Sequence, residues 1–165
     1  MTKLVYFRSN YNWTRDYCKG KPDWLFIFAD NTDRSSGGHP IPTDRPYIKK
    51  YGPGKRFPNV TTACIRGLVN AMPISTQRWY RPGATYEKGR WNDEDLKEFI
   101  EVIDDEINEI KNYVIEYKPT HVVLPPNGLF NSRISDISME RCPKIFDALR
   151  TRLDALADWI NNLEA

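Results

Sequence analysis

The spacing of apolar residues predicts two long helices and one weaker helix. Between residues 93 and 117 apolar side chains recur every three or four positions, which places them on one stripe of an α-helix. Asn92 is a suitable N-cap residue, and Pro119 follows the end of the segment. The same spacing returns over residues 143–163, whose leading proline is tolerated in the first turn of a helix. A weaker stripe predicts a third helix over residues 59–69.

Short apolar runs predict four strands, at residues 3–7, 24–29, 71–76 and 121–125. The second and fourth runs lack alternation between apolar and polar residues, which is typical of strands covered on both faces. The last three strands alternate with the three helices, and such βαβ crossovers give parallel strands. We therefore expect one compact α/β domain over residues 1–165, with a largely parallel central sheet of about four or five strands and three flanking helices.

One segment does not fit this alternation. Residues 35–58 are rich in glycine, proline and basic side chains, and they are too many for a simple connection. We interpret them as an insertion within the single domain.

The net charge of +2 conceals a strong asymmetry. Residues 1–91 contain 16 Lys and Arg against six Asp and Glu, whereas residues 92–116 contain two Lys against ten acidic residues. Residues 117–165 contain six of each sign. The basic half favours an anionic small ligand, and the absence of a tight Lys/Arg cluster disfavours nucleic acid. The acidic segment is typical of the solvated face of a helix.

Several other classes of protein are disfavoured by composition. The three cysteines, Cys18, Cys64 and Cys142, are far apart and form no CxxC pair, so we expect reduced thiols and neither a disulfide scaffold nor a zinc site. No apolar run has the roughly 18 residues that a membrane helix needs, and the start of the chain does not resemble a signal peptide. We expect a cytoplasmic protein with no membrane association, no metal and no cofactor.

Three loops that follow predicted strands carry the candidate site. In an open α/β sheet, ligands bind outside the carboxyl ends of the strands. Asp30 and Asp33 are the candidate catalytic residues, because a carboxylate there would orient or deprotonate a water molecule. Glycines allow close approach of backbone N–H groups to phosphate, and arginines pair with its oxygens. The candidate ligand-binding residues are Asn31, Arg34, Gly37, Gly38, Arg66, Thr76, Gln77, Arg78, Gly128, Asn131, Ser132 and Arg133. Neither the dinucleotide fingerprint nor the P-loop motif is present.

Two stretches, FADNTDRSSGG and ACIRGLVNAMPISTQ, together resemble a group of small, largely uncharacterised proteins of phages and prophages. The shared pattern is F-[GA]-D-N, then Arg and Gly-Gly, then I-R-G-x-x-N-A and a strand ending I-x-T. VVLPPNGLFNSRIS and RCPKIFDAL resemble its later elements. The chain departs from the pattern at Ala29, at Gln77 in place of a frequent lysine, and in about twenty residues inserted after Gly38. The resemblance implies a Rossmann-like fold, loosely similar to domains that bind ADP-ribose or other nucleotides.

Two functions of different classes remain open at this stage. The first is binding of an anionic nucleotide derivative, either ADP-ribose, another NAD-derived molecule or a cyclic nucleotide. Such a phage-type protein would sequester or hydrolyse its ligand in counter-defence, and only the second role makes it an enzyme, a hydrolase. The alternative is a non-enzymatic interaction module that uses the acidic helix at residues 93–116 and its aromatic surface. A second copy of the chain, forming a homodimer, is a further expected partner.

Overall fold

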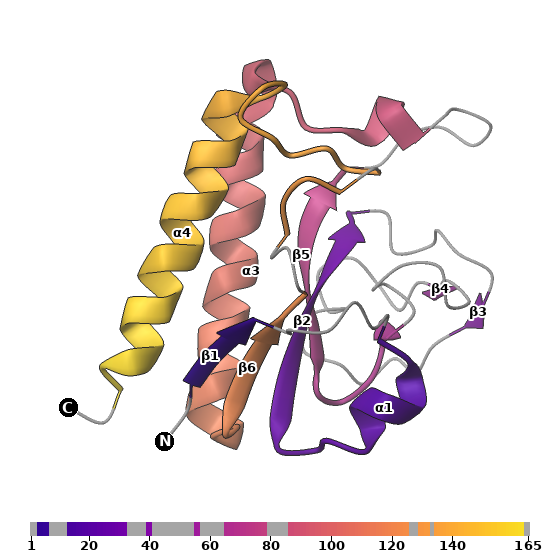
Figure 1. Ribbon diagram of the computed structural model, residues 1–165, viewed down its shortest axis with the longest axis vertical. Coiled ribbons are helices and arrows are strands. Elements are labelled where there is room, and N and C mark those ends of the chain that lie inside the picture. The colour runs from indigo at the N-terminus through magenta and orange to yellow at the C-terminus, as the bar shows by residue number, and fades with distance from the viewer. Residues whose placement is uncertain are drawn as a thin grey trace.

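The computed structural model describes residues 3–6, 13–32, 39–40, 55–56, 65–78, 86–125, 129–132 and 134–163. Figure 1 shows these residues as a coloured ribbon. All structural statements below refer to them.

The centre of the protein is a parallel β-sheet. Its strand order is β1-β6-β2-β5, and every neighbouring pair is parallel. The strands are β1 (Lys3–Tyr6), β2 (Trp24–Asn31), β5 (Ala71–Gln77) and β6 (His121–Leu124). The predicted mixed α/β architecture and parallel sheet are confirmed. β6 reaches its place between β1 and β2 through a crossover that contains the long helix α3.

Two long helices cover one face of the sheet. These are α3 (Leu96–Tyr117) and α4 (Pro143–Asn161), both predicted from the apolar spacing. They lie side by side and run in the same direction, with α3 against β5 and α4 against β1 (Figure 1). Because both helices run opposite to the strands, their N-termini lie at the carboxyl end of the sheet.

The short helix α1 (Arg15–Lys19) lies on the opposite side of the sheet (Figure 1). The Thr14 side chain caps it by accepting a hydrogen bond from the Tyr17 N–H at 3.1 Å. Sequence reasoning missed this helix, because five residues are too few to show an apolar period.

The insertion contains a small antiparallel pair, β3 (His39–Pro40) with β4 (Lys55–Arg56), which the sequence did not indicate. The predicted helix over residues 59–69 differs from the structure in its described part. Residues 65–70 form turns, with an i→i+3 hydrogen bond from the Leu68 N–H to the Ile65 carbonyl. Gly67 has a φ of 90°, which ends any helical run at that point.

Apolar side chains from the sheet and from both long helices form one core. Burial is complete along β5 and nearly so along β2, as expected for strands covered on both faces. The outer edge of β5 is closed by side chains rather than by another strand. The Ser75 N–H donates to Glu106 at 2.8 Å, and the Trp91 indole donates to the Ser75 carbonyl at 2.9 Å. No helix in the described ranges is long and apolar enough to cross a membrane.

Candidate functional site

Buried polar side chains concentrate at the carboxyl end of the sheet. Toward their amino ends, β2 and β5 bury apolar residues, whereas their last residues are polar and still buried. Burying such groups is costly unless they are hydrogen-bonded, so a cluster of them marks a place with a specific role. The buried polar residues at these strand ends and in the following loops are Asp30, Asn31, Ser75, Thr76, Gln77, Ser135 and Ser138.

A β-bulge shapes the cluster. Asp30 pairs with Ser75, but the next residue of β2, Asn31, pairs with Gln77, so Thr76 is an extra residue on β5. Bulges re-aim side chains and are enriched next to active sites. Here the bulge brings the carboxamide-bearing residues Asn31 and Gln77 to paired positions on adjacent strands. The Thr32 N–H then donates to the Gln77 carbonyl at 3.1 Å, which extends the pairing beyond the bulge.

Asp30 is held in a buried ion pair with Arg66. The Arg66 Nε donates to one carboxylate oxygen at 3.0 Å, and its Nη2 contacts the other oxygen. That second oxygen also accepts the Asn31 N–H at 2.8 Å. Both side chains are fully inaccessible to solvent. Asp30 and Arg66, predicted as catalytic and ligand-binding respectively, are therefore brought together, and each is engaged by the other.

The turn that carries Arg66 is tied to α1. Arg15 donates to the Arg66 carbonyl at 2.7 Å. The Asn70 side chain donates to the carbonyls of Cys18 and Lys21, both at 3.0 Å. Thus the I-R-G-x-x-N stretch forms a bracket that joins the end of β2, the start of β5 and α1.

Arg78 lies against the start of α3. Its guanidinium pairs with Asp95 and Glu98, both at 3.2 Å, and lies 5.7 Å from the centre of the Trp91 ring. The structure thus places this candidate phosphate-binding cation beside two carboxylates. Its backbone N–H donates to the Gly89 carbonyl at 2.8 Å, next to a bridge between Gln77 and Arg90.

The loop after β6 forms tight turns that contain two further candidates. Asn131 is exposed and has a φ of 57°, and its N–H donates to the Ile137 carbonyl at 3.0 Å. The Ser132 hydroxyl accepts the N–H groups of Ile134 at 3.1 Å and Ser135 at 3.4 Å. Ser132 therefore shapes the turn. Ser135 is 2% exposed, and its hydroxyl has no hydrogen-bond partner among the described residues.

Residues that sequence reasoning missed attach this loop to the end of β5. Arg90 donates to the Ile134 carbonyl at 2.9 Å, and the Gln77 amide donates to the same oxygen at 3.4 Å. Arg141 donates to the carbonyls of Asp136 at 2.7 Å and Trp91 at 2.8 Å. The loops after β5 and β6 are therefore joined at the carboxyl end of the sheet. No motif in the sequence pointed to these arginines, since their partners are backbone carbonyls.

The N-terminus of α4 is capped from the segment before α3. One Asp93 carboxylate oxygen accepts the N–H groups of Lys144 at 3.0 Å and Ile145 at 3.2 Å. Those two donors, which an anionic ligand would need, are satisfied within the protein.

The remaining candidates, Asp33, Arg34, Gly37, Gly38, Gly128 and Arg133, lie outside the described residues. Within the described ranges, no group of three or more His, Cys, Asp or Glu side chains is arranged to hold a metal ion.

The match to a protein-family model covers residues 8–152, which include every element of this site. Its description is Family of unknown function (DUF7831). The chain belongs to this family. No curated protein and no solved structure matches the chain significantly.

Proposed function

We propose that this DUF7831 protein binds an anionic nucleotide derivative at the carboxyl end of its Rossmann-like sheet. The observation that carries the proposal is the concentration of buried polar side chains at that end, centred on the bulge between β2 and β5. Ligands of open parallel sheets bind at this position, because the loops that follow the strands meet there.

The paired carboxamides favour a nucleobase as part of the ligand. A carboxamide presents a donor and an acceptor side by side, and this arrangement matches the edge of adenine. Asn31 and Gln77 face one another in register, and each is less than a tenth exposed. The phosphate contacts of the proposal belong to Arg34 and Arg133, which follow β2 and β6 in the sequence.

Sequestration is favoured over hydrolysis. A general base must be within reach of the proton it removes. Asp30 is fully buried, and both of its oxygens already accept hydrogen bonds. Its role in the proposal is to position Asn31 by accepting the Asn31 N–H, so no group of the described site needs to activate water.

The competing interaction module gains less support, because several carboxylates of the acidic helix serve the fold. Glu98 pairs with Arg78, Asp104 pairs with Arg152 at 2.6 Å, and Glu106 is buried against Ser75. Part of the negative charge of residues 93–116 is therefore used within the protein.

The resemblance to phage proteins provides a biological setting. A protein that binds a nucleotide signal without cleaving it lowers the free concentration of that signal. In an infected cell this would act as counter-defence, and the amount of protein would set the capacity of the effect.

Isothermal titration with ADP-ribose, NAD and cyclic AMP tests the proposal. We expect at least one to bind, and Asn31→Leu and Gln77→Leu each to weaken binding by about tenfold or more, since a well-placed carboxamide contributes roughly 1–3 kcal/mol to base recognition. Asn112→Leu is the matched control, because it removes an exposed carboxamide from α3.

Each variant is first compared with the wild type by urea unfolding, so that only folded proteins are titrated. Equal affinities in all four proteins would place the ligand elsewhere. An absence of heat from the whole panel at about 1 mM would refute nucleotide binding.

A further inference from the structure

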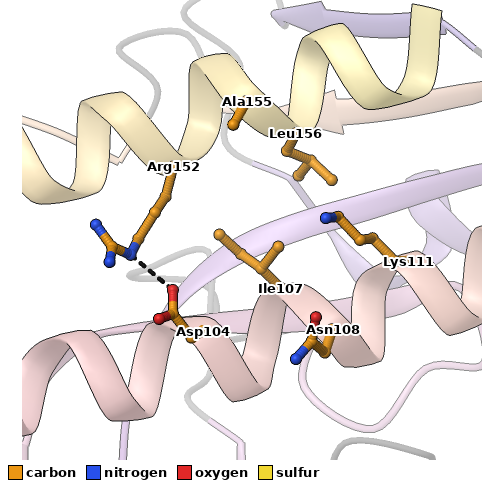
Figure 2. A pocket seen from close by; sticks show the side chains of 7 residues that line it. All are labelled: Asp104, Ile107, Asn108, Lys111, Arg152, Ala155 and Leu156. Atoms are coloured by element: carbon orange, nitrogen blue, oxygen red, sulfur yellow. Dashed lines mark hydrogen bonds and ion pairs between the residues drawn. The ribbon is translucent and has the colours of Figure 1, made fainter. Parts of the chain in front are cut away.

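A groove of about 370 Å³ lies between α3 and α4, on the far side of these helices from the sheet edge described above. Ile107 and Leu156 form its buried apolar floor, and the small side chain of Ala155 leaves space above them. Figure 2 shows Lys111 reaching from α3 toward α4, and Arg152 reaching from α4 toward α3. The groove thus has an apolar floor between two cationic side chains.

Lys111 is an unusual cation for its position. It lies in the segment that contains ten acidic residues, yet the residues four positions before and after it are Ile107 and Ile115. The carboxylate that would pair with a helical lysine at that spacing is therefore missing. Its ammonium lies 5.4 Å from the centre of the Trp159 ring, and among the described residues it has neither an ion-pair nor a hydrogen-bond partner. The aromatic ring holds the charge half-buried beside the groove.

Arg152 supplies the second cation in a fixed position. Its Nε pairs with Asp104 at 2.6 Å, and its Nη1 donates to the Ala148 carbonyl at 3.2 Å. These contacts orient the guanidinium and leave its Nη2 without a partner in the described part of the chain. With Asp104 counted, the groove carries one net positive charge.

We propose that this groove binds a small organic carboxylate that has an apolar body. The carboxylate would lie between the Lys111 ammonium and the Arg152 guanidinium, and the body would pack on Ile107 and beside Ala155. The carboxamide of Asn108 lies at the same groove and offers a further donor. A volume of 370 Å³ falls within the roughly 300–1,000 Å³ of small-molecule sites.

Phenylbutyrate is a suitable probe, with phenylbutanol as its uncharged counterpart, and binding is measured by isothermal titration of the intact protein. We expect saturable binding of the acid with a dissociation constant below about 1 mM. Lys111→Met keeps the apolar stem but removes the charge, and Ala155→Leu fills the space above the floor. Each should weaken binding by about fivefold or more, and the alcohol should bind more weakly than the acid by a similar factor.

Lys97→Met is the matched control, because it removes an exposed lysine of α3 that does not line the groove. It should leave the affinity unchanged. Equal binding of the acid and the alcohol, equal loss in the control, or no saturable binding at about 10 mM would each overturn the proposal. Nucleotide binding by the Lys111→Met variant should equal that of the wild type, so the two proposed sites fail or stand separately.

Discussion

Replacing Asp30 by alanine should destabilise the protein rather than merely remove a ligand contact. The substitution leaves the Arg66 guanidinium buried without its carboxylate, and both side chains are inaccessible to solvent in the folded state. Removal of one partner from a buried ion pair costs roughly 3–5 kcal/mol, because an uncompensated charge remains in a medium of low polarity.

This loss is a large fraction of the stability of a protein domain, which is about 5–15 kcal/mol. For a chain of 165 residues, each kcal/mol corresponds to roughly 2–4 °C in the midpoint of thermal unfolding. We therefore expect Asp30→Ala to lower the midpoint by about 6–20 °C. Arg66→Met added to Asp30→Ala should recover part of the loss, because it removes the unpaired charge.

Urea unfolding followed by circular dichroism measures the free energy of unfolding of each variant. Asp23→Ala is the control, since Asp23 is an exposed carboxylate directly before β2, and its removal should change stability by no more than about 0.5 kcal/mol. An Asp30→Ala variant that loses less than about 1 kcal/mol would refute the reasoning. A double variant less stable than Asp30→Ala would refute the assigned cause.

Three further predictions concern the framework of the site. Glu106→Leu should cost about 1–3 kcal/mol in urea unfolding because it leaves the Ser75 N–H and hydroxyl unpaired, whereas Glu101→Leu on the exposed side of α3 should cost little. Asp93→Ala should cost about 0.5–2 kcal/mol, as it removes the acceptor of two N–H groups in the first turn of α4; an unchanged urea midpoint would contradict the capping role. Burial raises the pKa of the Cys142 thiol, so iodoacetamide should modify it far more slowly in the folded than in the unfolded protein, as measured by peptide mass mapping. The raised pKa also means that Cys142 contributes stability below the ordinary thiol range and that this contribution is lost as the pH rises above it, so a gain in stability at high pH would oppose this assignment.

The two long helices were predictable because their signals are local. Apolar spacing indicated α3 and α4, and the capping box of Asn92 with Asp95 and the proline at position 143 lie where sequence rules expect helix starts. The parallel strands were also predictable, since short apolar runs alternate with those helices.

The role of the polar residues was less predictable because it depends on long-range contacts. Asp30 was correctly placed at the end of a strand, yet its pairing with Arg66 depends on a turn that lies 36 positions further along the chain. Arg78 meets the carboxylates of α3 only because the chain returns past the end of β5. Arg141 binds mainly backbone carbonyls, which leave no trace in the pattern of residue types. Sequence reasoning therefore found the position of the site, and the structure separates the residues that support it from those that line it.

The binding of ADP-ribose, followed through the side-chain amide resonances of the protein in solution, tests the central claim most directly. The account predicts that the amide signals of Asn31 and Gln77 shift saturably with ligand concentration, while those of Asn112 on the exposed face of α3 remain in place. Saturable binding that leaves the Asn31 and Gln77 signals unmoved, or no binding of any nucleotide in the panel, would contradict it.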